Sequence, residues 1–248
     1  MEGYDASTYG DGFADVYDEW YGQVSDITAT VDVIAELAGG GPVLELGVGT
    51  GRLAIPLADR GLEVHGVDAS PAMVARLRAK PGGDAVQVTL ADFADVDVDV
   101  VGGFAVAFVA FNTLFNLVTA EAQQRCFASV AARLRPGGSF VVEVLAPDHD
   151  ASPSGGGLTT SSVTTDRVVL QATMADRPSQ TISGSSIEIA ESGIRLRPWR
   201  IRWATTEQLD EMAAAAGLVV RHRWAGWDRS PQAADEARRV TVYERLPA

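Results

Sequence analysis

The amino-acid sequence predicts an α/β protein built on a doubly wound, mostly parallel sheet of about seven strands. Three observations support this fold class. Short apolar runs alternate with amphipathic segments over the first 150 residues. A glycine-rich turn follows the first run, and polar or acidic residues follow the next three. The length of 248 residues suits one domain with a modest insertion.

The first strand and the turn after it are the most informative stretch. The apolar run Val43–Leu46 ends at three glycines in alternate positions, Gly47, Gly49 and Gly51, and an amphipathic segment then continues to about Arg60. This order predicts a strand, a tight turn and a helix. Because glycine lacks a Cβ atom, it accepts positive φ angles and lets the backbone approach a small ligand closely.

Four further core strands are predicted, over residues 62–68, 86–90, 104–110 and 140–145. The strand over 104–110 is apolar throughout, as in the buried centre of a parallel sheet. Asp68, Asp92 and Asn112 end or directly follow three of these strands. A doubly wound sheet binds ligands at the carboxyl ends of its strands, so we expect these residues to lie close to one ligand.

An aromatic stripe precedes the first strand. Within residues 9–21 the side chains at helical spacing are Phe13, Val16, Tyr17, Trp20 and Tyr21, which predicts a short helix with an aromatic stripe. Such a stripe either packs against the domain or closes over a ligand as a lid. A second helix is predicted over 27–38.

The pattern changes after the fifth strand. Residues 151–204 are rich in serine, threonine and glycine, and they alternate in a way that predicts antiparallel strands joined by hairpins. We expect this insertion to lie over one edge of the main sheet, because so few strands bury little core of their own. Thr205 then marks a helix N-terminus. The last two strands, over 218–224 and 239–246, are predicted to pair antiparallel.

Composition excludes several function classes. The formal charge of −13 opposes generic binding to nucleic acid or to an anionic membrane. The single cysteine, Cys126, permits no intrachain disulfide and suggests no thiolate metal site, so we expect no metal. The N-terminus lacks the basic and apolar regions of a signal peptide, and no apolar run reaches membrane-spanning length. These features predict a cytoplasmic protein.

The glycine turn must be distinguished from a nicotinamide dinucleotide site, whose fingerprint is G-x-G-x-x-G followed by an acid about 20 residues on. Asp68 fits that acid, but Arg52 occupies the position of the third glycine. Glu45 beside the turn would also repel a pyrophosphate. The turn therefore favours a cationic ligand without phosphates, and a nicotinamide-dependent oxidoreductase remains as the alternative.

The ordered motifs resemble those of class I S-adenosylmethionine-dependent methyltransferases of the small-molecule type. They are the run from Glu45 to Gly51, then Asp68, the run Ala91-Asp92-Phe93, and the run Leu134–Gly138. A weaker resemblance, in the aromatic N-terminal helix and the stranded insertion, is to amino-sugar N-methyltransferases of bacterial secondary metabolism. The resemblance implies a Rossmann-like fold and a methyl transfer from S-adenosylmethionine to a nitrogen or oxygen of a small metabolite.

The resemblance also implies roles for the matched residues. Glu45 would face the methionine part of the cofactor, Asp68 would accept the ribose hydroxyls, and Asp92 would accept the adenine amine. Met73 and Phe93 would supply apolar surfaces to the adenine ring. The remaining expected cofactor residues are Tyr17, Gly47, Gly49, Gly51, Arg52, Ala69, Ala91, Phe111 and Asn112.

Residues for catalysis and substrate binding are harder to choose. His149, in the loop after strand five, is a candidate general base, whereas His65 and His222 fall within strands and are interpreted as structural. Asn116 stands where the amino-sugar enzymes have a histidine, and Tyr9 could approach the sulfonium. The candidate substrate residues are Tyr21, Glu143 and Trp199, with Arg195, Arg197, Arg200 and Arg202 available either to an anionic substrate or to surface carboxylates.

On this interpretation the chain has three parts. Residues 1–150 form a cofactor-binding core with an N-terminal helical lid, residues 151–204 form an insertion that covers the substrate or makes a dimer contact, and residues 205–248 complete the sheet. The expected partner is a small-molecule substrate, and the protein is a monomer or a homodimer. A non-catalytic protein that binds S-adenosylmethionine for regulation is a second alternative.

Overall fold

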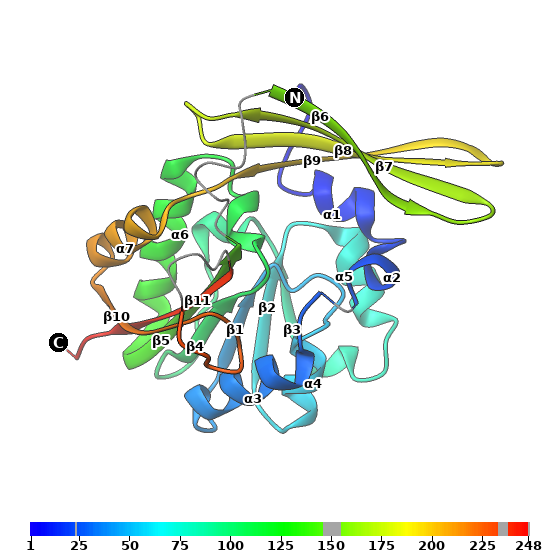
Figure 1. Ribbon diagram of the computed structural model, residues 1–248. Coiled ribbons are helices and arrows are strands. Elements are labelled where there is room, and N and C mark those ends of the chain that lie inside the picture. Colours follow the sequence, from blue (N-terminus) through cyan, green and yellow to red (C-terminus); the bar gives the residue numbers. More distant parts are fainter. Residues whose placement is uncertain (23, 146–154, 233–237, 248) are drawn as a thin grey trace.

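The computed structural model describes residues 1–22, 24–145, 155–232 and 238–247. Over these residues the chain forms a seven-stranded sheet flanked by helices and a separate four-stranded sheet above it (Figure 1). The order of the large sheet is β10-β11-β5-β4-β1-β2-β3. The predicted α/β class is confirmed, with a mostly parallel sheet whose order reverses beside β1.

The parallel part of the large sheet consists of β1 (Val43–Leu46), β2 (Val64–Asp68), β3 (Gln87–Leu90), β4 (Phe104–Val109) and β5 (Leu134–Leu145). Two antiparallel strands complete it, β11 (Arg238–Arg245) beside β5 and β10 (Leu218–Trp224) beside β11. The predicted antiparallel last pair is therefore confirmed. Every residue of β1 and β4 is buried, as expected for central strands covered on both faces.

Helices cover both faces of the large sheet. The cluster on one face includes α3 (Ile27–Ala38) and α4 (Ala54–Asp59), and the cluster on the other includes α6 (Ala120–Arg133) and α7 (Thr206–Ala215). Successive strand side chains point to opposite faces, so Val43 belongs to the first cluster and Leu44 to the second. This burial fixes the register of the strands and hence the positions of the loops at their carboxyl ends.

Helix N-termini follow the capping signals of the sequence. Ser70 accepts from the backbone N–H of Met73 and begins α5 (Pro71–Arg78), with proline at the first helical position. Thr205 and Gln208 form a reciprocal capping box at the start of α7. Both of these predicted helix starts are confirmed.

The N-terminal aromatic segment differs from its prediction. The expected single helix is divided into α1 (Thr8–Phe13) and α2 (Tyr17–Tyr21). The division turns the stripe into a compact cluster, in which the Tyr9 and Phe13 rings stack with centroids 4.7 Å apart and Phe13 is fully buried. Gly10 allows α1 to approach α5 closely, because a Cβ atom there would lie 2.4 Å from Ser70 Cβ.

The insertion forms four strands, β6 (Gly155–Val163), β7 (Arg167–Asp176), β8 (Thr181–Ala190) and β9 (Gly193–Arg202), each antiparallel to the next. The strand β6 has only a weak signal in the sequence, because it consists mostly of glycine, serine and threonine. The expected position over one edge of the main sheet is wrong. The insertion lies above the carboxyl ends of the parallel strands, where β9 packs on α1 (Figure 1).

The two faces of the insertion differ in character. The inner face carries Arg197 and Trp199, which pack on the N-terminal helices. On the other face Leu158, Ile194 and Leu196 are largely exposed. The insertion is therefore attached through buried polar contacts as much as through apolar packing.

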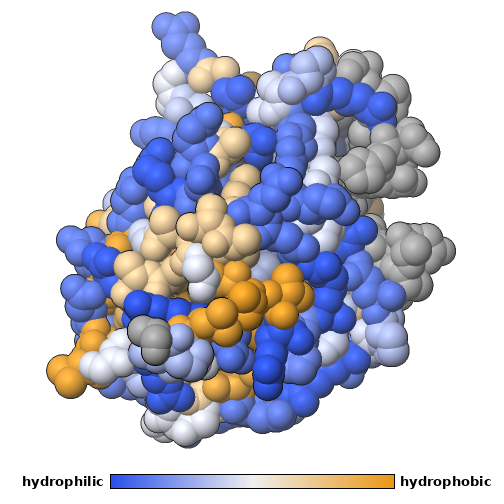
Figure 2. All heavy atoms as spheres, turned by 90° about the vertical axis from the view of Figure 1, so that its left-hand side faces the viewer, coloured by the Kyte–Doolittle hydropathy of each residue, from blue (hydrophilic) through white to orange (hydrophobic). Residues whose placement is uncertain are grey.

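The strand β10 forms one edge of the large sheet. Figure 2 shows apolar side chains gathered across this face, surrounded by hydrophilic ones. Val219 and Val220 of the edge strand β10 are among the exposed large apolar residues. Within the residues that the structure describes, no helix is long and apolar enough to cross a membrane.

Candidate active site

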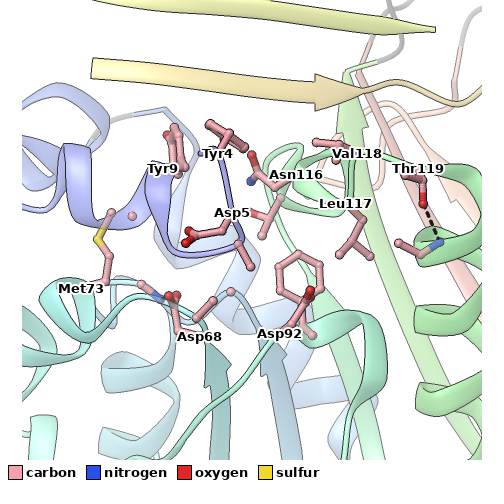
Figure 3. Close-up of a pocket in the computed structure, with 18 of the residues that line it drawn as sticks. Tyr4, Asp5, Tyr9, Asp68, Met73, Asp92, Asn116, Leu117, Val118 and Thr119 are labelled. Atoms are coloured by element: carbon pink, nitrogen blue, oxygen red, sulfur yellow. Dashed lines mark hydrogen bonds between the residues drawn. The ribbon is translucent and has the colours of Figure 1, made fainter. Parts of the chain in front are cut away.

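A cavity of about 200 Å³ lies between the carboxyl ends of the parallel strands and the N-terminal helix α1 (Figure 3). Its lower wall is formed by the loops after β1, β2 and β3. Its upper wall is formed by the segment 4–10 and by the connection from β4 to α6, over residues 113–122. The strand β9 passes above the upper wall (Figure 3). The cavity therefore lies where a doubly wound sheet is expected to bind its ligand.

The glycine turn gives the lower wall its closest approach to the cavity. Gly47 and Gly49 both have positive φ angles, 68° and 54°, and both line the cavity. A Cβ atom on Gly47 would lie 2.4 Å from Thr113 Cγ2, so no side chain fits there. Gly51, with φ of 80°, does not line the cavity. Its absent side chain instead makes room for Ile55 and Leu77, each 2.9 Å from the position of a Cβ atom.

Asp68 is fixed in place by the glycine turn. One carboxylate oxygen accepts from the Gly49 N–H at 2.7 Å, and the other accepts from the Ser70 N–H at 2.8 Å. Burial raises the pKa of Asp68, although these two hydrogen bonds oppose that rise. The side chain points to the cavity beside Ala69 and Met73 (Figure 3). A ligand with hydroxyl donors would find here an immobile acceptor.

Asp92 and Phe93 follow β3 and form the next part of the lower wall. Asp92 caps a short 3-10 turn (Phe93–Asp95) by accepting from the Ala94 N–H at 2.9 Å, and it faces the cavity opposite Asp68 (Figure 3). The ring of Phe93 and the side chain of Met73 are both nearly buried, and both line the cavity. Ala91 does not line it.

A small hollow of about 20 Å³ adjoins the cavity and holds Glu45 and Arg52. Tyr17, Gly47 and Gly49 line both spaces, so the hollow continues the cavity. Glu45 is only 5% exposed, and its Oε2 atom has no hydrogen-bond partner. Burial raises the pKa of Glu45 to about 8, although Arg52 opposes the rise. Such an unpaired buried carboxylate is expected to favour a cationic ligand group.

The turn after β4 carries backbone strain. Phe111 and Asn112 are consecutive non-glycine residues with positive φ, at 47° and 62°. Glu143 Oε2 accepts from the Phe111 N–H at 2.8 Å, and Asn112 Oδ1 accepts from the Leu145 N–H at 2.6 Å. Phe111 reaches the small hollow, whereas Asn112 is directed to β5. Glu143 is 1% exposed and lines neither space, so its contact is with this turn.

The aromatic residues of the N-terminal segment divide into two groups. Tyr9 and Tyr17 line the cavity, and burial raises the pKa of both, that of Tyr17 to about 12. Tyr21 and Trp199 line neither space. They pack in the aromatic cluster behind the upper wall, around Phe13.

The two described histidines, His65 and His222, do not line the cavity. His149 lies outside the described residues. His65 hydrogen-bonds Glu63 at 2.8 Å, His222 stacks on Trp224, and neither lines the cavity. Asn116 does line it and points inward from the right-hand side of the upper wall (Figure 3). Over the described residues, the cavity has no histidine, lysine or arginine in its lining.

Several residues that line the cavity are not among the predicted site residues. Tyr4 and Asp5 precede the aromatic stripe and carry no periodic signal, yet both line the upper wall. Thr113, Leu117 and Thr119 lie in the β4 to α6 connection, where the predicted residues are Phe111, Asn112 and Asn116. The only sequence signal for Tyr4 and Asp5 is the acidic residue itself, four residues before Tyr9.

Comparisons with known proteins agree with this geometry. Residues 43–138 match the family model described as a methyltransferase domain. The cypemycin N-terminal methyltransferase of a Streptomyces species is 30% identical over 209 residues, which cover 83% of this chain and 84% of that protein. The chain belongs to the class I S-adenosylmethionine-dependent methyltransferases. This family membership overturns the alternative of a nicotinamide-dependent oxidoreductase.

Solved structures of methyltransferases share the whole architecture. The CcbJ methyltransferase from Streptomyces caelestis is 41% identical, with a TM-score of 0.91 over 98% of this chain and 100% of that chain. The sugar N-methyltransferase KedS8 from Streptoalloteichus is 23% identical, with a TM-score of 0.70 over 100% of this chain and 99% of that chain. At that lower identity the likeness is one of fold.

The lining residues fit S-adenosylmethionine, the cofactor of the family. The cofactor carries a sulfonium and an ammonium group, and the two spaces offer the unpaired carboxylate oxygen of Glu45 and the carboxylate of Asp68. The lack of side chains at Gly47 and Gly49 provides a backbone cradle between these two acids. Met73 and Phe93 supply the apolar surfaces that a planar base requires.

Proposed function

We propose that this methyltransferase transfers a methyl group from S-adenosylmethionine to the nitrogen of a small-molecule amine, such as an amino sugar or another secondary metabolite. The observation that carries the proposal is the cavity itself. It has carboxylates, phenols and apolar groups in its lining, and the described residues supply no basic side chain. The name of the cypemycin relative, an N-terminal methyltransferase, supports nitrogen as the acceptor atom.

The cofactor would occupy the lower wall. Asp68 would accept the two ribose hydroxyls, and Asp92 would accept the adenine amine. Met73 and Phe93 would hold the adenine ring. The methionine end would extend over the glycine turn into the small hollow, where Glu45 would pair with its ammonium group and Arg52 with its carboxylate.

When bound, S-adenosylmethionine supplies a methyl group already activated by the positive sulfur, so the reaction needs alignment more than covalent help. The upper wall would provide that alignment. Tyr9 and Tyr17 would cover the sulfonium and exclude water. Asn116 would hold an N–H of the acceptor through its side-chain oxygen and so direct the nitrogen lone pair at the methyl group.

The lining favours nitrogen over oxygen as the acceptor atom. An alcohol or phenol needs a base with a pKa near neutrality, usually a histidine. Among the described residues, no histidine lines the cavity. Asp68 accepts from Gly49 and Ser70 and belongs to the lower wall, which the cofactor would occupy, so it is not placed to take a proton from the acceptor. A neutral amine carries a free lone pair and requires no base at the moment of attack.

Two measurements test the proposal. Calorimetry with S-adenosylmethionine and S-adenosylhomocysteine should show binding of both by the natural protein and its loss in Asp68→Ala, while the exposed Asp84→Ala control retains it. Mass spectrometry should then show methylated products from a panel of amines and none from matched alcohols. Binding without transfer to any amine would instead support a non-catalytic, regulatory protein.

A further inference from the structure

The charges around the cavity are one-sided. Three carboxylates line it, those of Asp5, Asp68 and Asp92, and across the described lining no basic residue balances them. Asp68 and Asp92 belong to the lower wall, which the cofactor would occupy. Asp5 is the remaining acid, and it stands in the upper wall on the side of Tyr4, Tyr9 and Asn116 (Figure 3).

One carboxylate oxygen of Asp5 accepts hydrogen bonds from neighbouring residues, and these bonds do not involve the other oxygen. The Oδ1 atom accepts from the backbone N–H and the hydroxyl of both Ser7 and Thr8, at 2.9 to 3.0 Å. These hydrogen bonds, with those from Thr8 first, lower the pKa of Asp5, so the carboxylate remains ionised. They engage Oδ1 alone, which leaves the acceptor capacity of Oδ2 for a ligand.

The arginines of the insertion do not offset this negative charge. Arg195 pairs with Asp15 at 2.6 Å, and Arg197 pairs with both Asp15 and Glu188. Arg202 donates to the side chains of Gln123 and Gln180. The sequence alternative of a basic ribbon that holds an anionic substrate therefore loses three of its four members.

The fourth arginine, Arg200, meets the upper wall at Tyr4 without lining the cavity. The Arg200 N–H donates to the Tyr4 hydroxyl oxygen at 3.1 Å, and Arg200 does not line the cavity. That hydrogen bond ties Tyr4, which precedes Asp5, to the strand β9. Asp5 is thereby held at both sides, by Tyr4 on β9 and by Ser7 and Thr8 at the start of α1.

We propose that the acceptor amine enters as an ammonium ion recognised by Asp5 Oδ2, and that the site rejects substrates that carry phosphate. This inference deepens the proposed N-methylation and rests on it. Apolar groups of Leu117, Val118 and Ala122 line the same cavity, so the amine is expected on an apolar body. A substrate linked to a nucleoside diphosphate would bring two negative charges to a wall that already carries an unbalanced one.

The proton and electron balance is simple. The bound ammonium ion first gives one proton to water at the mouth of the cavity, and a remaining N–H stays on Asp5. The freed lone pair forms the nitrogen–carbon bond while the carbon–sulfur bond breaks, and that bonding pair stays on sulfur as the thioether. The product is again an ammonium ion, now methylated, and S-adenosylhomocysteine.

The experiment uses the full chain saturated with S-adenosylhomocysteine and three probes. These are 2-phenylethylamine, its uncharged isostere 2-phenylethanol, and uridine diphosphate, each titrated by calorimetry at pH 7. The test variant is Asp5→Asn, because an asparagine oxygen still accepts from Ser7 and Thr8 while the charge is lost. Glu2→Gln, an exposed acid outside the lining, is the control for long-range charge.

The natural protein and Glu2→Gln should bind the amine at least about tenfold more tightly than the alcohol, as expected for a charge-assisted hydrogen bond. Asp5→Asn should lose that preference while it keeps the same melting temperature and the same affinity for S-adenosylhomocysteine. Uridine diphosphate should not bind to any of the three proteins.

Three results would overturn the inference: equal binding of amine and alcohol, a preference that survives Asp5→Asn, or competition by uridine diphosphate. An Asp5→Asn variant that instead loses affinity for S-adenosylhomocysteine would show that Asp5 serves the cofactor. Failure of the proposed N-methylation would give a different result from failure of this inference. The amine preference would persist and depend on Asp5, while mass spectrometry detects no methyl transfer to nitrogen.

Discussion

The two walls of the cavity are built in different ways. The lower wall consists of three consecutive strand–turn units, and its polar side chains are fixed by neighbours close in sequence. Asp68 is held by Gly49 and Ser70, and Asp92 by Ala94. The upper wall is assembled from segments nearly 200 residues apart, because Tyr4 is tied to Arg200 and α1 packs against β9. On the proposed function, methyl-donor recognition would depend on local motifs, and acceptor recognition on long-range contacts.

The largest expected effect breaks the upper wall alone. Arg197 is buried, donates to Gly12 and Asp15 of the N-terminal segment and to Glu188 of β8, and lies over the Trp20 ring. Arg197→Met would remove a buried guanidinium that joins the partly exposed carboxylates of Asp15 and Glu188 to the Gly12 carbonyl, and should cost about 3 kcal/mol of unfolding free energy. Chemical denaturation measures this loss.

The neighbouring Arg195 gives a matched control. Its side chain is 54% exposed and pairs with the same Asp15 at 2.6 Å. Arg195→Met should cost about 1 kcal/mol or less, as for other exposed ion pairs. Equal losses in the two variants would contradict the view that Arg197 fastens the upper wall to the insertion.

The second prediction breaks the lower wall. Gly47→Ala places a methyl group against Thr113 in a backbone conformation of positive φ, and it should reduce affinity for S-adenosylmethionine roughly a hundredfold. Gly39→Ala is the control, because Gly39 has a similar φ of 54° with open space around it. Calorimetry should show unchanged cofactor affinity in Gly39→Ala, at a stability cost of about 1 kcal/mol. An equal loss of cofactor affinity in both variants would show that the backbone strain of the substitution, and not the lost space at Gly47, reduces binding.

The third prediction concerns the pH dependence of cofactor binding. The pKa of Glu45 is about 8 in the free protein, so this carboxyl group is mostly protonated at pH 6. The cofactor ammonium favours the ionised form, so affinity should rise with pH and level off above about pH 9, roughly tenfold above its value at pH 7, with release of a proton. Calorimetry in buffers of different ionisation enthalpy measures that proton, and Glu45→Gln should bind without it.

The same group predicts a change in stability. The pKa of Glu45 is raised from 4.5 to about 8 in the folded protein, so the folded state binds its proton more tightly than the unfolded state. Its contribution to stability is therefore full below pH 4.5 and is lost as pH rises to 8. Glu45→Gln should lose less stability than the natural protein across that interval, and an identical pH profile would contradict the assignment.

The smallest expected effect sharpens the role of the upper wall. Asn116→Ala should lower kcat several-fold with amine substrates, because the nitrogen lone pair loses its alignment. The KM for S-adenosylmethionine should stay the same, since Asn116 lies on the acceptor side. Steady-state kinetics separates the two, and a raised KM for the cofactor with unchanged kcat would place Asn116 on the donor side.

The same division explains how far the sequence could predict the structure. The doubly wound, mostly parallel sheet, the antiparallel last pair and the capped starts of α5 and α7 follow from local periodicity and capping, and they are confirmed. Most of the residues of the lower wall were predicted from sequence motifs. Gly51 is an exception, since its packing role beside Ile55 and Leu77 gives the same glycine signal as a ligand-binding turn.

The upper wall lacked such signals. Asp5 has no periodic neighbours, and its position depends on how α1 docks under β9. Glu143 and Trp199 were chosen by strand position, yet Glu143 supports the backbone of Phe111 and Trp199 packs behind the cavity. Which side chains near the end of a strand face the cavity is set by tertiary assembly, which residue spacing does not encode.

A crystal structure with S-adenosylhomocysteine bound tests the division into two walls most directly. The account predicts the ribose hydroxyls on Asp68, the adenine between Met73 and Phe93, and an open space in front of the sulfur faced by Asp5 and Asn116. A product molecule whose ribose or adenine contacts Asp5, with no space left beside Asn116, would contradict it.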